Sequence, residues 1–369
     1  MNEVYCPLPF RHAYIDATGI GPCCQIRMDH HDLHTWVDNA ELKAMQQEIL
    51  AGTVPKACEV CHKQERQFGN SLRTDSGIDY NFEEFTDTVI DFIDYRSNNL
   101  CNFKCRSCNP VFSHGIANEA LNNPVMVKAF GPIENRVVSI ADSATDWIIS
   151  NVAQLNRLMF TGGEPTIMPE TRRIIEEVVA KNPEISILIT TNGSFTDDFW
   201  YELVDKIPRL HWTISIDAVG PAAEIVRHGT RWEQVEKNLR WLADNANSVN
   251  INTVVTNINL FHLRPVLELV LELQHRAARP NGLRHQFFVS RRPYMLAADN
   301  LTGELLAKAT AYLEGFKDLP LQEEPHEMLV NLMRQIEQAE PDEKLWAEFK
   351  EYSLELDRLR GQDHTKLFP

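Results

Sequence analysis

Strand-like and helical runs alternate along the chain from residue 89 to residue 290. Consecutive strands that are joined through helices run parallel, and their crossovers are right-handed. The alternation therefore predicts a parallel sheet with helices packed against it. Its spacing fits a partial (β/α) barrel as well as an open doubly wound sheet. The strand-like runs lie at residues 89–96, 155–162, 185–191, 210–217, 249–256 and 284–290.

Two segments without this alternation flank it. Residues 1–85 are rich in Cys, His and Pro, and apart from one expected helix at 40–51 we predict that they are irregular. A segment with so little apolar core of its own needs a metal to hold it. Residues 292–369 show amphipathic helical runs instead of strands. We therefore expect a metal-binding module at 1–85, the α/β region at 86–291 and a helical C-terminal extension at 292–369.

All eight cysteines lie in the first third of the chain. We see no signal peptide and no apolar run near the ~18 residues of a membrane span, so we expect a cytoplasmic protein without a membrane partner. In that reducing compartment, cysteines are more often metal ligands than disulfides. The formal net charge of −16 disfavours nucleic acid as a partner, because binding its phosphates requires basic surface.

Three of the cysteines, Cys101, Cys105 and Cys108, follow the first strand-like run at the spacing C-x3-C-x2-C. Three thiolates can hold three irons of a 4Fe–4S cluster and leave the fourth iron open. An open position on a metal centre binds a ligand or substrate, whereas a closed site is structural. The alternative interpretation of this loop is a structural zinc site.

Further motifs follow the later strands in register with the cysteine loop: TGGEP at 161–165, TTNG at 190–193 and SID at 215–217. Together with the cysteine loop, this ordered set resembles the radical S-adenosylmethionine (radical SAM) enzymes over roughly residues 89–290. The resemblance implies a partial (β/α)6 TIM-like barrel. It also implies reductive cleavage of SAM to a 5′-deoxyadenosyl radical that abstracts hydrogen from a substrate, with flavodoxin or ferredoxin as the type of reductant.

The resemblance also assigns residues to the cofactors. Cys101, Cys105 and Cys108 would hold the cluster whose open iron binds SAM. In TGGEP, the glycines let the backbone approach the ligand and the glutamate can pair with the SAM ammonium; these residues are Gly162, Gly163, Glu164 and Pro165. The candidates for the ribose and methionyl groups are Thr191, Ser215 and Asp217, and the candidate for the SAM carboxylate is Arg227. No catalytic side chain beyond these is predicted.

The sequence departs from the family pattern at one position of the cysteine loop. Many members carry an aromatic residue just before the third cysteine, where this chain has Ser107. Phe103 is the candidate to replace that aromatic residue beside the adenine of SAM.

The N-terminal cysteines resemble the auxiliary-cluster module of the SPASM/twitch branch of these enzymes, here placed before the barrel rather than after it. Cys6, Cys23, Cys58 and Cys61 would close a second 4Fe–4S cluster, with Cys24 as the alternative to Cys23. A zinc site built from the same C-x2-C half is the alternative metal centre. Unligated thiols are the remaining interpretation.

The leading hypothesis for the function is hydrogen abstraction from a peptide or protein, with net oxidation through the auxiliary cluster. Four cysteines that close this cluster favour electron transfer over direct binding of the substrate. The N-terminus shows no leader-peptide-binding domain, so oxidation of a sugar or small metabolite is the alternative reaction. A non-catalytic iron–sulfur or zinc module for redox sensing or binding is the alternative from a different class of protein.

Overall fold

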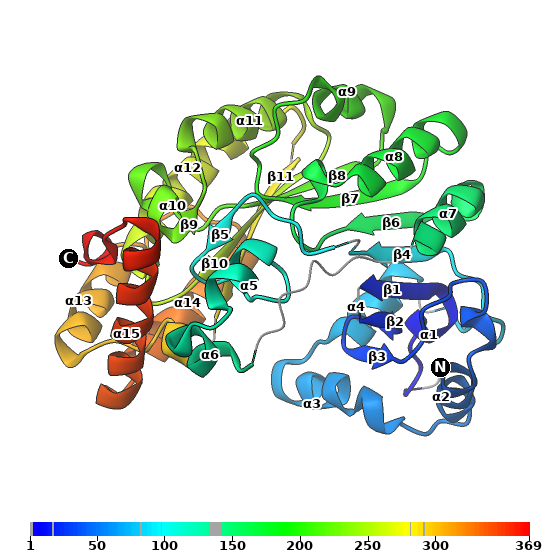
Figure 1. Cartoon of the computed structure of the whole chain (residues 1–369), viewed down its shortest axis with the longest axis horizontal. Coiled ribbons are helices and arrows are strands. Elements are labelled where there is room, and N and C mark those ends of the chain that lie inside the picture. The colour runs from blue at the N-terminus through cyan, green and yellow to red at the C-terminus, as the bar shows by residue number, and fades with distance from the viewer. Residues whose placement is uncertain are drawn as a thin grey trace. The chain divides into compact units, whose positions relative to one another are not determined.

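The computed structural model describes residues 3–16, 18–81, 83–96, 98–132, 142–280, 282–290 and 292–369. The chain divides into two compact units, whose elements are labelled in Figure 1. Unit 1 comprises residues 1–98, 138–162 and 168–188, and unit 2 comprises residues 99–137, 163–167 and 189–369. The boundaries predicted at residues 85 and 291 differ from this division and stay a prediction.

Unit 1 is built on strands in the order β6-β4-β1-β2-β3. Strand β1 (His12–Asp16) pairs in parallel with β4 (Phe92–Tyr95), which pairs in parallel with β6 (Arg157–Phe160). Strands β2 (Gly19–Cys23) and β3 (Ile26–Met28) extend this sheet in antiparallel fashion. The first half of β7 (Ser186–Thr191) lies beside β6. Helix α7 (Asp142–Asn151) packs against α8 (Pro169–Lys181) in the same unit.

The N-terminal segment is more regular than the sequence predicts. Besides the expected helix α2 (Ala40–Leu50), it contains α1 (Leu8–Arg11), α3 (Glu59–Phe68), α4 (Leu72–Asp79) and the three strands β1–β3. Strand β1 is almost wholly buried beside the first predicted strand. The glycines of β2 conceal its strand character in the sequence. A Cβ at Gly21 would lie 1.9 Å from the Ile26 carbonyl oxygen, so the tight approach of β3 requires glycine there.

Unit 2 contains the parallel strands β8 (Leu210–Ser215), β10 (Val249–Val255) and β11 (Leu283–Val289), with the end of β7 beside β8. The helices between the strands are α9 (Asp198–Lys206), α10 (Gly220–Val226), α11 (Trp232–Asn245) and α12 (Leu263–Arg276). Along the chain, β4, β6, β7, β8, β10 and β11 are the six strands that the sequence predicts, and at least one helix follows each of them before the next of the six. The fold is the expected mixed α/β fold of a partial TIM-like barrel, built on parallel strands.

The C-terminal helices share their cores with the strands and helices of unit 2. Helices α13 (Gly303–Glu314) and α14 (Glu323–Glu337) bury apolar side chains against Leu267 of α12 and Phe287 of β11. Helix α15 (Glu343–Arg360) instead packs with α5 (His114–Ala120), α6 (Pro124–Phe130) and α10. A short antiparallel pair, β5 (Lys104–Cys105) with β9 (Arg227–His228), lies in the same unit (Figure 1).

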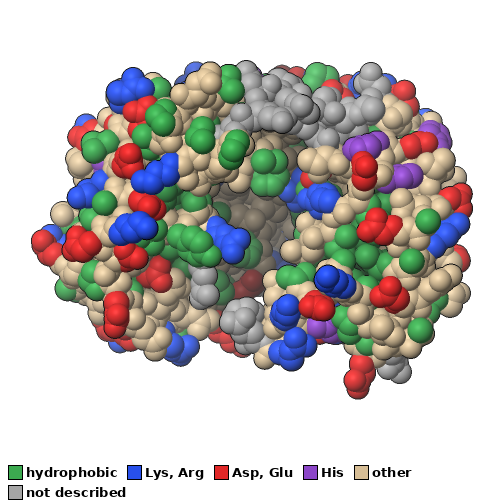
Figure 2. Space-filling view, turned by 60° about the horizontal axis from the view of Figure 1, so that its bottom comes forward, with side chains coloured by type: hydrophobic (Ala, Val, Ile, Leu, Met, Phe, Trp, Pro, Cys, Tyr) green, Lys and Arg blue, Asp and Glu red, His purple; other side chains and the backbone are tan. Residues whose placement is uncertain are grey.

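The surface carries charges of both signs. On the face shown in Figure 2, Asp and Glu side chains are interspersed with Lys and Arg. Among the helices of the described ranges, none is long and apolar enough to cross a membrane.

Candidate functional site

The loop of residues 101–108, called the cluster loop below, carries three of the predicted metal ligands in unit 2. Cys105 is buried, and Cys101 and Cys108 are partly buried. Burial raises the pKa of Cys101 to about 12, and burial followed by the charges of Cys105 and Cys101 raises the pKa of Cys108. Part of the rise at Cys101 and at Cys108 thus comes from the charges of the other thiols of the loop. Thiols in such surroundings ionise when a metal centre takes up the charge.

Two further features suit the cluster loop to an anionic iron–sulfur cluster. The Phe103 N–H donates to Cys101 Sγ at 3.4 Å, and hydrogen bonds to sulfur tune such clusters. Arg227 lies opposite Cys105 in the β5–β9 pair. Burial lowers the pKa of Arg227, but the charges of Cys105 and Asp217 outweigh burial and raise it. A permanent cation thus stands beside the thiols, and the residues present fit a cluster with three cysteine ligands.

The TGGEP motif contacts the start of the cluster loop through its backbone. A Cβ at Gly163 would lie 2.1 Å from the Leu100 carbonyl oxygen, so only glycine fits. The next N–H, that of Glu164, donates to the same oxygen at 2.8 Å. Gly162 has φ +107°, and Pro165 begins the short 3-10 helix η4 (Pro165–Ile167). The motif therefore fixes the residue directly before Cys101.

The carboxylate of Glu164 is buried and joins two loops. Its Oε1 accepts hydrogen bonds from the Thr166 N–H at 3.1 Å, the Thr166 hydroxyl at 2.6 Å and the Thr191 hydroxyl at 2.6 Å. Its Oε2 accepts one, from the Asn192 N–H at 2.7 Å. Burial raises the pKa of Glu164. Since Oε1 already has three donors, Oε2 is the atom with room for the predicted SAM ammonium.

Asp217 and Arg227 bind each other. Arg227 Nη1 donates to Asp217 Oδ2 at 2.7 Å, and the Val254 N–H donates to Asp217 Oδ1 at 2.8 Å. Arg227 Nε is buried and has no hydrogen-bond partner within the described residues. Ser215 ends β8, in register with Asn252 of β10. The structure thus pairs two residues that the sequence assigns to different groups of SAM.

Sequence reasoning missed a pair of asparagines that tie the cluster loop to the loop after β7. Asn192 Nδ2 donates to Asn102 Oδ1 at 2.7 Å, and Asn102 Nδ2 donates to the Ser194 hydroxyl at 2.8 Å. Both asparagines lie within predicted motifs, which is the only signal the sequence offers. No spacing rule pairs them.

The ring of Phe103 is buried beside Gly229. Its side chain is only 2% exposed, and a Cβ at Gly229 would lie 3.2 Å from the ring. The suggestion that Phe103 stands in for an aromatic residue at position 107 therefore gains no support from this arrangement.

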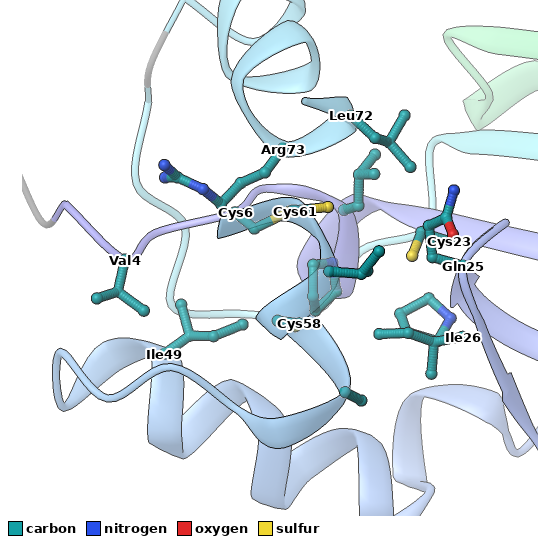
Figure 3. A pocket seen from close by; sticks show the side chains of 15 residues that line it. Val4, Cys6, Cys23, Gln25, Ile26, Ile49, Cys58, Cys61, Leu72 and Arg73 are labelled. Carbon is teal, nitrogen blue, oxygen red and sulfur yellow. The ribbon is translucent and has the colours of Figure 1, made fainter. Parts of the chain in front are cut away.

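The other four predicted ligands line one pocket in unit 1 (Figure 3). They come from three segments: Cys6 before α1, Cys23 at the end of β2, and Cys58 and Cys61 at the start of α3. Burial, and then the charges of the other three, raises the pKa of Cys6. Apolar side chains form most of the remaining wall, including Leu8, Pro9, Pro22, Ile26, Ile49 and Leu72. Four thiols around one mainly apolar pocket fit a cluster closed by protein ligands.

Cys24 lies outside this pocket. It is exposed, and Asp94 and Arg96 are its main charged neighbours, whereas Cys23 is buried and lines the pocket. The geometry thus favours Cys23 of the two. None of the eight cysteines is in a disulfide. Within the described part of the chain, no group of three or more His, Cys, Asp or Glu side chains is placed to hold a single metal ion.

The sequence matches the family model of the radical SAM superfamily over residues 95–270. The chain therefore contains a radical SAM domain. The matched residues include the cluster loop and every predicted SAM contact from Gly162 to Arg227. A comparison with curated proteins gives no match.

Several solved structures resemble the chain at low identity. One is anSMEcpe with bound AdoMet, at 17% identity and a TM-score of 0.42 over 62% of this chain and 58% of that chain. Another is Streptococcus suis SuiB bound to S-adenosylmethionine, at 14% identity and a TM-score of 0.40 over 76% and 59%. TYW1 with a lysine-pyruvate adduct follows at 14% identity and a TM-score of 0.31 over 58% and 70%. The chain thus spans less than two thirds of the first two proteins, and likenesses this distant carry no argument about activity.

Proposed function

We propose that this radical SAM enzyme abstracts hydrogen from a peptide or protein and completes a net oxidation with the help of a second 4Fe–4S cluster. The observation that carries the proposal is the convergence of Cys6, Cys23, Cys58 and Cys61 on one pocket. Four protein thiolates would leave no iron open to a substrate, so such a cluster suits electron transfer. Zinc in the same pocket is the alternative, and it would make this unit structural.

The SAM site would be assembled by residues of the radical SAM domain. Cys101, Cys105 and Cys108 would hold the first cluster, which together with SAM supplies a 5′-deoxyadenosyl radical when bound. Arg227 would bind the SAM carboxylate through N–H groups that Asp217 leaves available, notably Nε. This division of the guanidinium explains why one arginine can serve both a protein carboxylate and a ligand carboxylate.

The ammonium of the methionyl group, which is attached to the same carbon as the carboxylate, would meet the loops after β6 and β7. Glu164 would receive the SAM ammonium at Oε2, while the hydroxyls on Oε1 hold the carboxylate still. Thr191 therefore orients Glu164 besides its proposed contact with SAM, and Ser215 and Asp217 lie at the end of β8 for the ribose. A preformed network of this kind lowers the entropy lost on binding.

Net oxidation would remove two hydrogens from the substrate: one as a hydrogen atom taken up by the 5′-deoxyadenosyl radical, and one as a proton released to solvent together with an electron that must leave the active site. The second cluster is the proposed acceptor, and a reductant such as flavodoxin or ferredoxin would serve the first in the cytoplasm. Oxidation of a sugar or small metabolite uses the same balance of hydrogens and electrons. The choice of a peptide rests on the resemblance of the N-terminal cysteines to the SPASM/twitch branch, in which peptide modification is common, and not on a substrate contact.

The test is an anaerobic turnover assay with SAM and dithionite, in which mixed synthetic peptides and mixed sugars are offered in separate reactions. The proposal predicts a peptide product lighter by two hydrogens, formed together with 5′-deoxyadenosine and identified by mass spectrometry. Deoxyadenosine formation stimulated by sugars and not by peptides would contradict the substrate class. The Cys58→Ser variant is the matched control: it should still cleave SAM but lose the oxidised product.

A further inference from the structure

We propose that helix α15 anchors the cluster loop, and that Arg106 and its partner Asp357 are positioning residues for the cysteines on either side of Arg106. Arg106 lies between Cys105 and Cys108, two of the three proposed ligands. The inference involves unit 2 alone, so it stands whether or not unit 1 binds a second cluster. It assigns a role to the C-terminal helical extension, which neither the family match nor the proposed function explains.

The side chain of Arg106 is completely buried, which is unusual for an arginine in a loop. Each of its three guanidinium nitrogens nevertheless has at least one acceptor. Nε donates to the Ile225 carbonyl oxygen at 3.1 Å, and Nη1 donates to the Ser353 carbonyl oxygen at 3.4 Å. Nη2 donates to the Asp357 carboxylate and, at 3.2 Å, to Gln362 Oε1. Three of these four acceptors belong to α15 or to the residues directly after it.

The backbone of Arg106 is held as well. Its N–H donates to the Val226 carbonyl oxygen at 2.9 Å, and its carbonyl oxygen accepts from the Tyr352 hydroxyl at 2.9 Å. Tyr352 belongs to the buried face of α15. Because both the side chain and the peptide groups of Arg106 are fixed, the peptide segment from Cys105 to Cys108 has little freedom to move relative to α15.

Asp357 is itself kept in place by the chain that follows α15. Gly361, which has φ +62°, caps the C-terminus of α15, and the chain turns back so that His364 reaches Asp357. The His364 N–H donates to Asp357 Oδ2 at 2.9 Å, and the His364 ring Nδ1 lies 2.6 Å from the same oxygen. The carboxylate therefore meets Arg106 with one oxygen and His364 with the other. This arrangement fixes the direction from which the guanidinium is held.

A second ionic link joins α15 to the residue before Cys105. Lys104 Nζ donates to Glu119 Oε1 at 2.5 Å, and Arg360 Nη2 donates to Glu119 Oε2 at 2.6 Å. Arg360 is the last residue of α15 and its side chain has no exposed area. Burial raises the pKa of Glu119, but Arg360 and Lys104 outweigh burial and lower it. The residues on both sides of Cys105 are thus tied to the same helix.

A loop that holds metal ligands needs such outer support, because the partners of ligand residues set the ligand geometry. If Asp357 loses its charge, the buried guanidinium of Arg106 loses its counter-charge and must move or take up water. Such a movement changes the positions of Cys105 and Cys108 relative to Cys101. A role confined to folding would lower stability without altering the cluster.

The experiment uses full-length, anaerobically reconstituted protein and three variants: Asp357→Asn, Arg106→Lys and, as the control, Arg358→Gln. Arg358 lies one residue from Asp357 on α15, and its side chain is 67% exposed. The readouts are the electron paramagnetic resonance spectrum of the reduced protein, its change on adding SAM, and the rate of iron loss to a chelator. Only a cluster with an open iron responds to SAM, so the second readout selects the cluster loop.

We expect Asp357→Asn to alter the SAM-responsive signal and to weaken iron retention by about 10–100-fold, while Arg358→Gln behaves as the wild type. Arg106→Lys keeps the positive charge but cannot reach all four acceptors, so it should show a smaller change of the same kind. An Asp357→Asn protein with the wild-type signal and iron retention but a lower unfolding temperature would overturn the proposal. If that variant does not fold, wild-type behaviour of Arg106→Lys would overturn it.

Discussion

Replacing Gly163 with alanine tests the close contact between the TGGEP motif and the cluster loop. A Cβ at this position would lie 2.1 Å from the Leu100 carbonyl oxygen, 2.7 Å from the Leu100 carbonyl carbon and 2.8 Å from the Asn99 carbonyl carbon. All three atoms belong to the backbone, so no side-chain rotation relieves the overlap. Ordinary contact begins at 3.4 Å, so the oxygen must recede by 3.4 − 2.1 = 1.3 Å.

A shift of this size breaks the 2.8 Å hydrogen bond from the Glu164 N–H to the Leu100 carbonyl oxygen. Leaving a buried donor without its partner costs about 1–3 kcal/mol. Overpacking in a close-packed region costs about 1–3 kcal/mol more. We therefore expect Gly163→Ala to lower the free energy of unfolding by about 2–6 kcal/mol, a large part of the ~5–15 kcal/mol typical of a folded protein.

The assay is urea-induced unfolding of the metal-free protein, followed by circular dichroism. Gly303→Ala is the matched control, because Gly303 opens α13 and the nearest atom to its added Cβ lies 3.7 Å away. Alanine there should be neutral or stabilising by up to about 1 kcal/mol. Equal unfolding midpoints for the two variants would show that the TGGEP motif and the cluster loop move apart without cost. The predicted steric overlap would then be wrong.

Three further predictions concern the cysteine pocket, the glutamate network and the anchor of the cluster loop. Cys23→Ser should reduce the iron bound after reconstitution from about eight to about four atoms per chain, whereas Cys24→Ser should leave it unchanged; the reverse result would show that Cys24 is the ligand instead of Cys23. Thr191→Val removes a donor to Glu164, so it should destabilise the protein by about 1.5–3 kcal/mol in urea and raise the Kd for SAM, while Thr191→Ser should not. Burial raises the pKa of Asp357, but hydrogen bonds from its partners, His364 first and then Arg106, outweigh burial and lower it. The charged Asp357 therefore stabilises the folded protein fully above about pH 4. This stabilisation is lost as the pH falls through the lower pKa of the folded state. Asp357→Asn should flatten the stability of the metal-free protein in that acid range, and a profile identical to wild type would contradict this assignment.

The alternation of strands and helices was readable in the sequence because each element is long and strongly patterned. Strand β10 (Val249–Val255) alternates buried and partly buried residues along its whole length, and α11 (Trp232–Asn245) carries a clear apolar face. The N-terminal strands were not readable, since β2 consists of GIGPC, in which Gly and Pro are typical of turns. It forms a strand because it pairs with β1 and β3, and the sequence does not reveal that pairing.

The candidate site was predictable in its motif residues and not in their mutual contacts. The cysteines and TGGEP are recognisable because the ordered set of motifs resembles the radical SAM enzymes. The engagement of Glu164 with Thr191 joins residues 27 positions apart, and Arg106 meets Asp357 across 251 positions. Such contacts depend on how α15 and the loops pack. The sequence around Arg106, a single arginine between two cysteines, does not indicate that packing.

The most direct measurement counts iron and sulfide per chain after anaerobic reconstitution, together with the 5′-deoxyadenosine formed from SAM and dithionite. It tests whether seven cysteines hold two clusters. We expect about eight irons per chain and the formation of deoxyadenosine. About four irons with one zinc would contradict the second cluster and make unit 1 structural. A full complement of reducible iron without any deoxyadenosine, with the peptide and sugar mixtures present, would contradict the SAM chemistry itself.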